Sequence, residues 1–198
     1  MNVLQMLATM YVTLMGPVLA GIINSLWCKL KVMKKLQIPM DGGKSLKDGK
    51  RIFGDHKTWK GFIGYIIWNV VCMVVWGLIC KVAGLEHYNM LYTNYENTIL
   101  FNLAAGGLVG FGYALFELPN SFLKRRLGIE PGKSMSGMLK AFFLFFDQAD
   151  SVFGCVLVVC IFAPMSVGFY FLYVVVGAVT HIIINMLLYA CKLRKNMF

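Results

Sequence analysis

Five long apolar blocks, each near the length of a membrane-spanning helix, constrain this chain more than any other feature. About 20 predominantly apolar residues are needed to cross a bilayer as a helix. The 198-residue chain is 59% hydrophobic and only 14% charged, which is not the composition of a soluble globular domain. We therefore predict an all-α integral membrane protein with five transmembrane helices, built as a single domain over residues 1–198. The blocks cover approximately residues 3–26, 62–80, 98–118, 142–164 and 168–190.

The fourth block is the weakest of the five, because its uninterrupted apolar part, Val152–Met165, is short for a span. It reaches spanning length only when Phe142–Ser151 is included. The first block has neither Lys nor Arg before it and is longer than the apolar core of a signal peptide, so we expect a helix there. Polar residues within the blocks are interpreted as partners in hydrogen bonds between helices. They are Asn24, Asn69, Asn102, His181 and Asn185.

The net charge of +10 is confined to a few stretches of the chain. Of the 19 Lys and Arg residues, all but Lys81 lie in segments 29–60, 119–140 and 192–195. Connections rich in Lys and Arg remain on the cytoplasmic side of a membrane. The pattern predicts a multi-pass protein of the cell membrane, with its N-terminus outside, its C-terminus in the cytoplasm and two functional cytoplasmic loops.

The first of these loops, residues 38–61, interleaves glycines with basic and acidic residues. Glycines let backbone N–H groups approach an anion closely, and Lys and Arg donate to phosphate oxygens. Thr58 is placed to cap the following helix, whose N-terminus also favours anions. We expect this loop to bind a polyphosphate. The alternative is that its charges only set topology and touch anionic lipid heads, which we favour for the basic residues of segment 29–35. Gly43-Lys44-Ser45 is not a Walker A loop, because Ile38 stands where that motif needs glycine.

The second loop begins after the third block, and Pro119 predicts the end of the third helix. Glu117 falls at that boundary, either as an ordinary interfacial acid or as an orienting partner for a lysine or a metal. Lys124 and Arg125 can clamp a phosphate, or can serve topology alone.

Two carboxylates, Asp147 and Asp150, stand near the start of the fourth block. Residues three apart share one face of a helix, so both side chains can point at one place. A carboxylate at the centre of a membrane helix costs about 2.5–3.5 kcal/mol on insertion scales, so a compensating interaction is expected. Hard oxygen ligands beside phosphates favour Mg²⁺. The alternatives are that the pair caps an interfacial stretch or pairs with Lys or Arg from the loops.

The six cysteines and three histidines predict no metal centre of their own. There is no Cys-x-x-Cys, and the histidines lack the spacing of zinc ligands. Most of the cysteines lie in or beside apolar blocks, where they are interpreted as small apolar residues of the helix packing.

Five runs of residues outside or at the edges of the apolar blocks resemble the CDP-archaeol synthase family, integral membrane cytidylyltransferases related to CDP-diacylglycerol synthases. The resemblance extends over residues 38–154 in the family's order, and the five-helix layout agrees with it. Two departures are Met40, where an aliphatic residue is more usual, and His56, where a small residue is common. The runs are Pro39-Met40-Asp41-Gly42-Gly43-Lys44, Asp48-Gly49-Lys50-Arg51, Gly54-Asp55-His56-Lys57-Thr58-Trp59-Lys60-Gly61, Glu117-Leu118-Pro119-Asn120-Ser121-Phe122-Leu123-Lys124-Arg125 and Phe145-Phe146-Asp147-Gln148-Ala149-Asp150.

The resemblance implies an enzyme that uses CTP and Mg²⁺ to convert a lipid phosphate into a CDP-lipid and pyrophosphate, with its active site facing the cytoplasm. The lipid in the family is 2,3-bis-O-(geranylgeranyl)-sn-glycerol 1-phosphate, an unsaturated archaetidic acid. Asp147, Asp150 and Lys124 are implied as catalytic residues, with both aspartates holding the metal. A further set is implied in nucleotide and phosphate binding: Lys44, Arg51, Gly54, Asp55, Lys57, Thr58, Lys60, Gly61, Asn120, Ser121 and Arg125.

Other functions fit parts of the sequence. A CDP-diacylglycerol synthase, acting on ester-linked phosphatidic acid, uses the same residues. A cation-coupled transporter uses the aspartate pair but leaves the glycine-rich basic loop without a role. A non-catalytic scaffold predicts no CTP binding, and the motif of CDP-alcohol phosphotransferases is absent. The expected partners are CTP, a lipid phosphate and the bilayer, with no nucleic acid; the pattern leaves the oligomeric state open.

Overall fold

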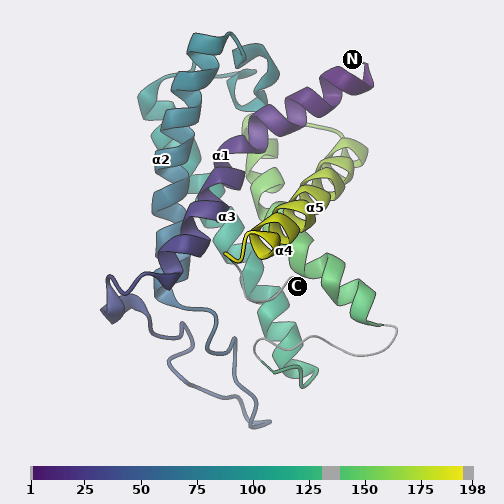
Figure 1. The fold of residues 1–198 in the computed structure, drawn as a ribbon. Helices are drawn as coiled ribbons and strands as arrows, with labels where there is room; N and C mark the ends of the chain where they lie inside the picture. The colour runs from purple at the N-terminus through teal and green to yellow at the C-terminus, as the bar shows by residue number, and fades with distance from the viewer. Residues whose placement is uncertain (1, 131–138, 194–198) are drawn as a thin grey trace.

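The computed structural model describes residues 2–130 and 139–193, and its architecture is a bundle of five long helices (Figure 1). Each of the five is long and apolar enough to cross a membrane by length and composition. The prediction of an all-α fold with five candidate spans is therefore confirmed, with isolated β-bridges as the only β-pairing in the described residues. The helices are α1 (Val3–Lys29), α2 (Trp59–Ala83), α3 (Ile99–Arg126), α4 (Leu139–Phe162) and α5 (Val167–Ala190), and short 3₁₀ turns cover Lys34–Leu36, Glu86–Tyr88 and Met90–Tyr92.

Side-chain caps set where four of the helices begin. Thr58 caps α2 by accepting from the N–H of Gly61 at 3.2 Å, as its place in the sequence predicts. Thr98 and Ser166 cap α3 and α5 in the same way, and Asn2 begins α1 with a capping box. The Thr58 cap places the start of α2 at Trp59, earlier than the apolar block alone indicates.

The prediction that Pro119 ends the third helix is wrong, because α3 continues through it to Arg126. Proline removes one backbone donor, but neighbouring helices and hydroxyl side chains make this tolerable in a membrane helix. The Ser121 hydroxyl donates to the carbonyl of Glu117 at 3.0 Å within this turn. The continuation matters for function, because it keeps Asn120 and Lys124 on one helical face, one turn apart.

Glycines allow α3 to pack tightly between α2 and α4. A Cβ at Gly106 would lie 2.9 Å from the Cα of Val70 on α2. A Cβ at Gly154 of α4 would lie 2.1 Å from the carbonyl oxygen of Gly112 on α3. Real Cβ atoms do not approach that closely, so these residues set the spacing between the helices.

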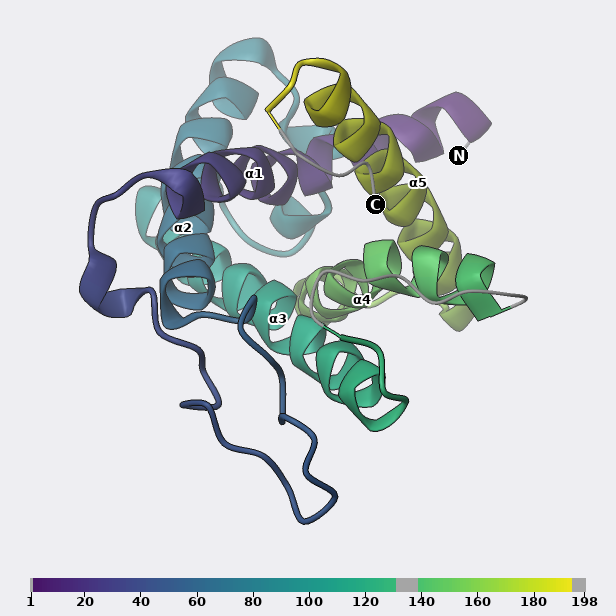
Figure 2. The ribbon, with the colours of Figure 1, turned by 60° about the horizontal axis from the view of Figure 1, so that its bottom comes forward.

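The connection from residue 30 to residue 58, the end of α3 and the start of α4 lie at the same end of the bundle (Figures 1 and 2). Hydrogen bonds tie the helices together along their length. Asn69 of α2 donates to the carbonyl of Gly106 at 2.7 Å, and Tyr173 of α5 donates to the carbonyl of Met10 at 2.9 Å. All six cysteines are free thiols, three of them fully within the buried core.

Candidate active site

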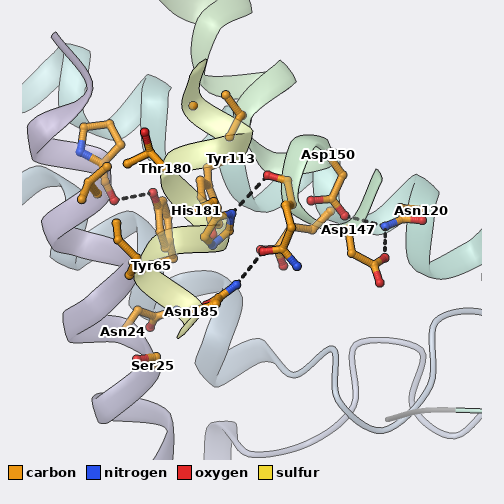
Figure 3. A pocket seen from close by; sticks show the side chains of 18 of the residues that line it. Asn24, Ser25, Tyr65, Tyr113, Asn120, Asp147, Asp150, Thr180, His181 and Asn185 are labelled. Atoms are coloured by element: carbon orange, nitrogen blue, oxygen red, sulfur yellow. Dashed lines mark hydrogen bonds between the residues drawn. The ribbon is translucent and has the colours of Figure 1, made fainter. Parts of the chain in front are cut away.

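The carboxylates of Asp147 and Asp150 meet at a single side chain of α3 (Figure 3). The Nδ2 amide of Asn120 donates to Oδ1 of Asp147 and to Oδ2 of Asp150, both at 2.7 Å. Asp150 is buried and also accepts from the N–H of Ser151 at 2.6 Å. The three-residue spacing thus brings both carboxylates to one place, as the sequence predicts.

Two lysines form ion pairs around these carboxylates. Lys124, one turn beyond Asn120 on α3, pairs with Oδ2 of Asp147. Lys57, from the loop before α2, pairs with Oε2 of Glu117 on α3. Glu117 is therefore the partner of a lysine, which was one of the two interpretations of this residue. Asp147 also pairs with a lysine, Lys124 of α3.

The pKa of the Lys57 ammonium is raised above its usual value. Burial opposes the charged form, but the carboxylates of Glu117, Asp150 and Asp147 together outweigh that effect. Lys57 thus stays protonated at neutral pH and carries its charge into the electrostatic field of both aspartates.

Arg125 is the most unusual basic residue of the site. The residue is only 8% exposed, yet its Nε and Nη1 have no hydrogen-bond partner within residues 2–130 and 139–193. A buried guanidinium with unmatched donors is costly, and its planar donor set suits phosphate oxygens. Arg125 therefore brings two nitrogens without hydrogen-bond partners in the described chain to the end of α3.

All of these groups line one large cavity with a volume of about 1130 Å³. Walls come from α1, α3, α4 and α5 and from Tyr65 of α2, and the loop before α2 contributes Phe53, His56 and Lys57. The volume slightly exceeds the roughly 300–1,000 Å³ that holds a drug-sized ligand. The charged lining residues are Lys29, Lys57, Glu117, Lys124, Arg125, Lys140, Asp147 and Asp150.

Some residues predicted to bind nucleotide do not line this cavity. Thr58 and Gly61 line a small adjoining pocket that shares Lys57 and Glu117 with the large one. Lys44, Arg51, Gly54, Asp55 and Lys60 line neither pocket.

Lys60 is buried and its ammonium is already engaged. Its Nζ donates to the carbonyl of Leu30 at 2.6 Å and lies 5.3 Å from the ring centre of Trp27. The Lys60 ammonium therefore lies at the C-terminal end of α1, where it donates to the carbonyl of the capping residue Leu30.

Asp41 organises the loop before α2, and the sequence analysis gave it no role. Its buried carboxylate pairs with Arg51 at 2.6 Å and accepts from the N–H groups of Gly43, Phe53 and Gly54. Burial opposes ionisation, but the Arg51 guanidinium and the backbone donors hold the pKa of Asp41 well below its usual range. An aspartate followed by two glycines is typical of a turn. This pattern was the feature of the sequence that could have indicated a structural role for Asp41.

The loop is also fixed against the end of α3. Arg126 pairs with Asp48 at 2.6 Å, and the Lys50 ammonium donates to the carbonyl of Arg126 at 2.7 Å. Arg51 is held by Asp41 and by Asp55, so both of its ion-pair partners belong to the loop itself. This network positions His56 and Lys57 at the cavity wall.

Comparison with known proteins decides the family. The family model described as CDP-archaeol synthase matches residues 6–198. The chain belongs to the CDP-archaeol synthase family. A CDP-archaeol synthase of Archaeoglobus fulgidus is 33% identical over 161 residues, covering 79% of this chain and 82% of the relative. One of Methanospirillum hungatei is 28% identical over 164 residues, covering 80% and 88%.

A solved structure shares the fold of this CDP-archaeol synthase family member. It is described as an intramembrane enzyme for archaeal membrane lipids biosynthesis, and it aligns with a TM-score of 0.60 at 21% identity. The alignment covers 89% of this chain and 92% of that chain. This chain therefore shares its fold with that structure.

Proposed function

We propose that this protein transfers a cytidylyl group from CTP to 2,3-bis-O-(geranylgeranyl)-sn-glycerol 1-phosphate, giving CDP-archaeol and pyrophosphate. The observation that carries the proposal is the convergence of Asp147 and Asp150 on Asn120, beside Lys124 and Arg125, within a membrane-type helix bundle. Membership of the CDP-archaeol synthase family supports the same reaction.

The reaction is an in-line displacement at phosphorus. An oxygen of the lipid phosphate forms a bond to the α-phosphorus of CTP, and the bond from that phosphorus to the oxygen bridging to the β-phosphate breaks. Pyrophosphate leaves with the electron pair of the broken bond. The attacking phosphate is already ionised, so the site needs no general base. Its residues have to bring two anions together and stabilise the charge of the leaving group.

The carboxylate cluster fits Mg²⁺ by the chemistry of its donors. Asp147 and Asp150 offer hard oxygens at one place, and the buried Oδ1 of Asn120 has no hydrogen-bond partner within the described chain. Mg²⁺ typically takes one or two carboxylates and completes its ligands with water and substrate phosphates. When bound, the ion supplies charge neutralisation at the transferring phosphate.

The basic residues hold the two phosphate groups. Arg125 offers a phosphate two nitrogens that make no hydrogen bond within residues 2–130 and 139–193. Lys124 and Lys57 are paired with Asp147 and Glu117, so each exchanges a carboxylate for substrate oxygens when substrate and metal bind. Asn120 keeps the two aspartates together and thereby positions the metal ligands.

The active-site end of the bundle faces the cytoplasm in this proposal, where CTP is present. Lys and Arg concentrate in the loop of residues 29–60, which lies at that end, and this supports the orientation. The N-terminus then lies outside.

A single assay tests the proposed function. Purified protein in lipid nanodiscs receives CTP, Mg²⁺ and either the diether lipid phosphate or ester-linked phosphatidic acid, and mass spectrometry resolves the products. We expect a CDP-lipid from the diether substrate at a higher kcat/KM than from the diester. Preference for phosphatidic acid points instead to a CDP-diacylglycerol synthase, and absence of any CDP-lipid overturns the proposal.

A further inference from the structure

The chain leaves α1 through residues 30–38, which we call the elbow segment and which belongs to neither hydrophobic cluster of the buried core. Figures 1 and 2 both show it at the side of the bundle, next to the end of α1. Apolar side chains that are 46–61% exposed occur at four positions: Leu30, Val32, Met33 and Ile38. Exposed lysines that form no ion pair among the described residues occur at three more: Lys31, Lys34 and Lys35. The segment therefore exposes apolar and basic side chains together, with no acidic residue between them.

Hydrogen bonds hold both ends of the elbow segment beside the first turn of α2. At its start, Nζ of Lys60 donates to the carbonyl of Leu30 at 2.6 Å. At its end, the N–H of Trp59 donates to the carbonyl of Ile38 at 3.1 Å. Trp59 is the first residue of a candidate membrane span, and it is 38% exposed, as is typical of tryptophans at a membrane–water interface. The segment is thus a short closed loop at the boundary between the apolar helices and water.

Met33 has a backbone conformation that an apolar residue seldom adopts. Its φ of 49° and ψ of 45° lie in the left-handed region, where a residue with a Cβ pays a steric cost and Gly or Asn is favoured. Its side chain is 61% exposed, so packing within the described chain does not account for an apolar residue at this turn. Strain of this kind persists at sites where a side chain is held in place for a function. Met33 is therefore presented outward, on the surface that also carries the lysines.

The elbow segment is next to the candidate active site without being part of it. Lys29, the residue before the segment, lines the large cavity, and Met40, which follows it closely, lines the small adjoining pocket. Within the described chain, residues 30–38 line neither of the two. Whatever binds the segment is thus held beside the cavity mouth and outside the space available to a nucleotide.

The mixture of side chains on the segment matches a membrane surface. Anionic lipids present phosphate groups above hydrocarbon, and lysines interleaved with exposed apolar side chains can contact both layers at once. A soluble anion such as CTP would engage the lysines but would leave the apolar side chains in water. Charge and apolar exposure together therefore favour lipid headgroups as the occupant of this surface.

We propose that the elbow segment binds the anionic headgroups of the leaflet in which it lies and gathers lipid phosphate at the mouth of the cavity. Lys31, Lys34 and Lys35 contact headgroup phosphates. Val32 and Met33 enter the apolar edge of the leaflet. The gathering role rests on the proposed function, because the gathered lipid is the substrate of that reaction; the binding of headgroups does not depend on it.

Hydrogen exchange tests the binding without any turnover. The N–H groups of residues 31–35 donate to no backbone carbonyl of the described chain, so contact with lipid should slow their exchange. The full-length protein is placed in nanodiscs of phosphatidylcholine or of phosphatidylglycerol. We expect exchange at residues 31–35 to be at least about fivefold slower in phosphatidylglycerol, which is the effect of one lysine near an anionic surface.

Removal of the three lysine charges should affect both binding and activity. The triple variant Lys31→Gln, Lys34→Gln and Lys35→Gln should lose the difference in exchange between the two kinds of nanodisc. Its KM for lipid phosphate, measured as a mole fraction in phosphatidylcholine, should rise about fivefold or more, while its KM for CTP stays within about twofold.

Two controls separate the surface from net charge and from the turn. The first removes the same charge from exposed lysines outside the cavity lining and should match the wild type: Lys47→Gln with Lys81→Gln and Lys192→Gln. The second, Met33→Asn, keeps a residue that tolerates the left-handed conformation but removes the apolar side chain. It should speed exchange at residues 31–35 in both kinds of nanodisc, and exchange that is equal or slower would exclude insertion of Met33.

Several results would overturn the proposal. Equal exchange of the wild type in the two kinds of nanodisc excludes headgroup binding, and this comparison needs no variant to fold. Slowing that follows added CTP instead of anionic lipid assigns the surface to the nucleotide. An unchanged KM for lipid phosphate in the triple variant excludes the gathering role. If the wild type forms no CDP-lipid, the proposed function fails, and the exchange measurement still decides whether the segment binds anionic lipid.

Discussion

Gly112 and Gly154 bring the backbones of α3 and α4 into direct contact, since a Cβ at Gly154 would lie 2.1 Å from the carbonyl oxygen of Gly112. Gly154 lies one helical turn from Asp150, and Gly112 lies about two turns from Asn120. The contact between the two glycines therefore sets the distance over which Asn120 reaches both aspartates at 2.7 Å.

Gly154→Ala should separate α3 from α4 and damage the site without changing a reactive group. We expect kcat/KM to fall at least about tenfold, since displacements near 1 Å can cost more than that. Overpacking should also lower stability by about 1–3 kcal/mol. Gly107→Ala is the control, because its Cβ would meet nothing nearer than Val70 Cγ2 at 3.9 Å. Thermal unfolding and product formation are measured together; wild-type activity in Gly154→Ala would contradict this account.

Removal of either carboxylate should abolish most activity while leaving the fold intact. Asp147→Asn and Asp150→Asn retain side-chain size but lose the charge that holds the cation in the proposed mechanism, so we expect a loss of at least about 100-fold in kcat. Rates are measured over a titration of Mg²⁺. Glu96→Gln, an exposed acid outside the cavity lining, should match the wild type at every concentration. Full rates for either aspartate variant at low Mg²⁺ would remove these residues from the metal site.

Arg125→Met should change activity and stability in opposite directions. Two nitrogens of the buried guanidinium have no hydrogen-bond partner among the described residues, so an apolar side chain of similar length should raise the unfolding temperature of the ligand-free protein. Loss of charged hydrogen bonds to phosphate should lower kcat/KM about 10- to 100-fold. Lys81→Met, an exposed residue outside the cavity lining, should change neither quantity. A variant that is both less stable and fully active would show that Arg125 is a structural residue.

The loop before α2 should depend on ionised Asp41. Its pKa is lower in the folded protein than in the unfolded chain, so its contribution is complete above about pH 4 and is lost as pH falls through the folded value. Asp41→Asn should therefore expose the amides of Gly43, Phe53 and Gly54 to hydrogen exchange at pH 7. Wild-type protein should retain their protection at pH 5. Equal protection in both proteins at pH 7 would show that the loop does not depend on this carboxylate.

The helices and the meeting of the two aspartates were predictable because both follow from local periodicity. The length of an apolar block predicts whether it can span a membrane as a helix. A spacing of three residues places Asp147 and Asp150 on one helical face. Thr58 as a cap is equally local. The prediction that Pro119 ends the third helix was wrong, because the effect of a proline depends on packing against neighbouring helices, and α3 continues past it to Arg126.

The roles of the basic residues were less predictable, because charge alone does not name a partner. Lys57 and Lys60 lie three residues apart in the same basic run, yet one pairs with Glu117 and the other donates to the carbonyl of Leu30. Those partners are 60 and 30 residues away in the chain, respectively.

Lys57 and Lys60 provide a matched pair for testing that difference. Lys57→Met should raise the KM for CTP or lower kcat by about tenfold or more, because Lys57 lines the cavity and is a phosphate ligand in the proposed mechanism. Lys60→Met should leave the KM for CTP within about twofold but lower stability by about 1–3 kcal/mol, because the carbonyl of Leu30 loses its donor. Kinetics and thermal unfolding of both variants check the pair. A KM for CTP raised as strongly by Lys60→Met as by Lys57→Met would place Lys60 among the phosphate ligands after all.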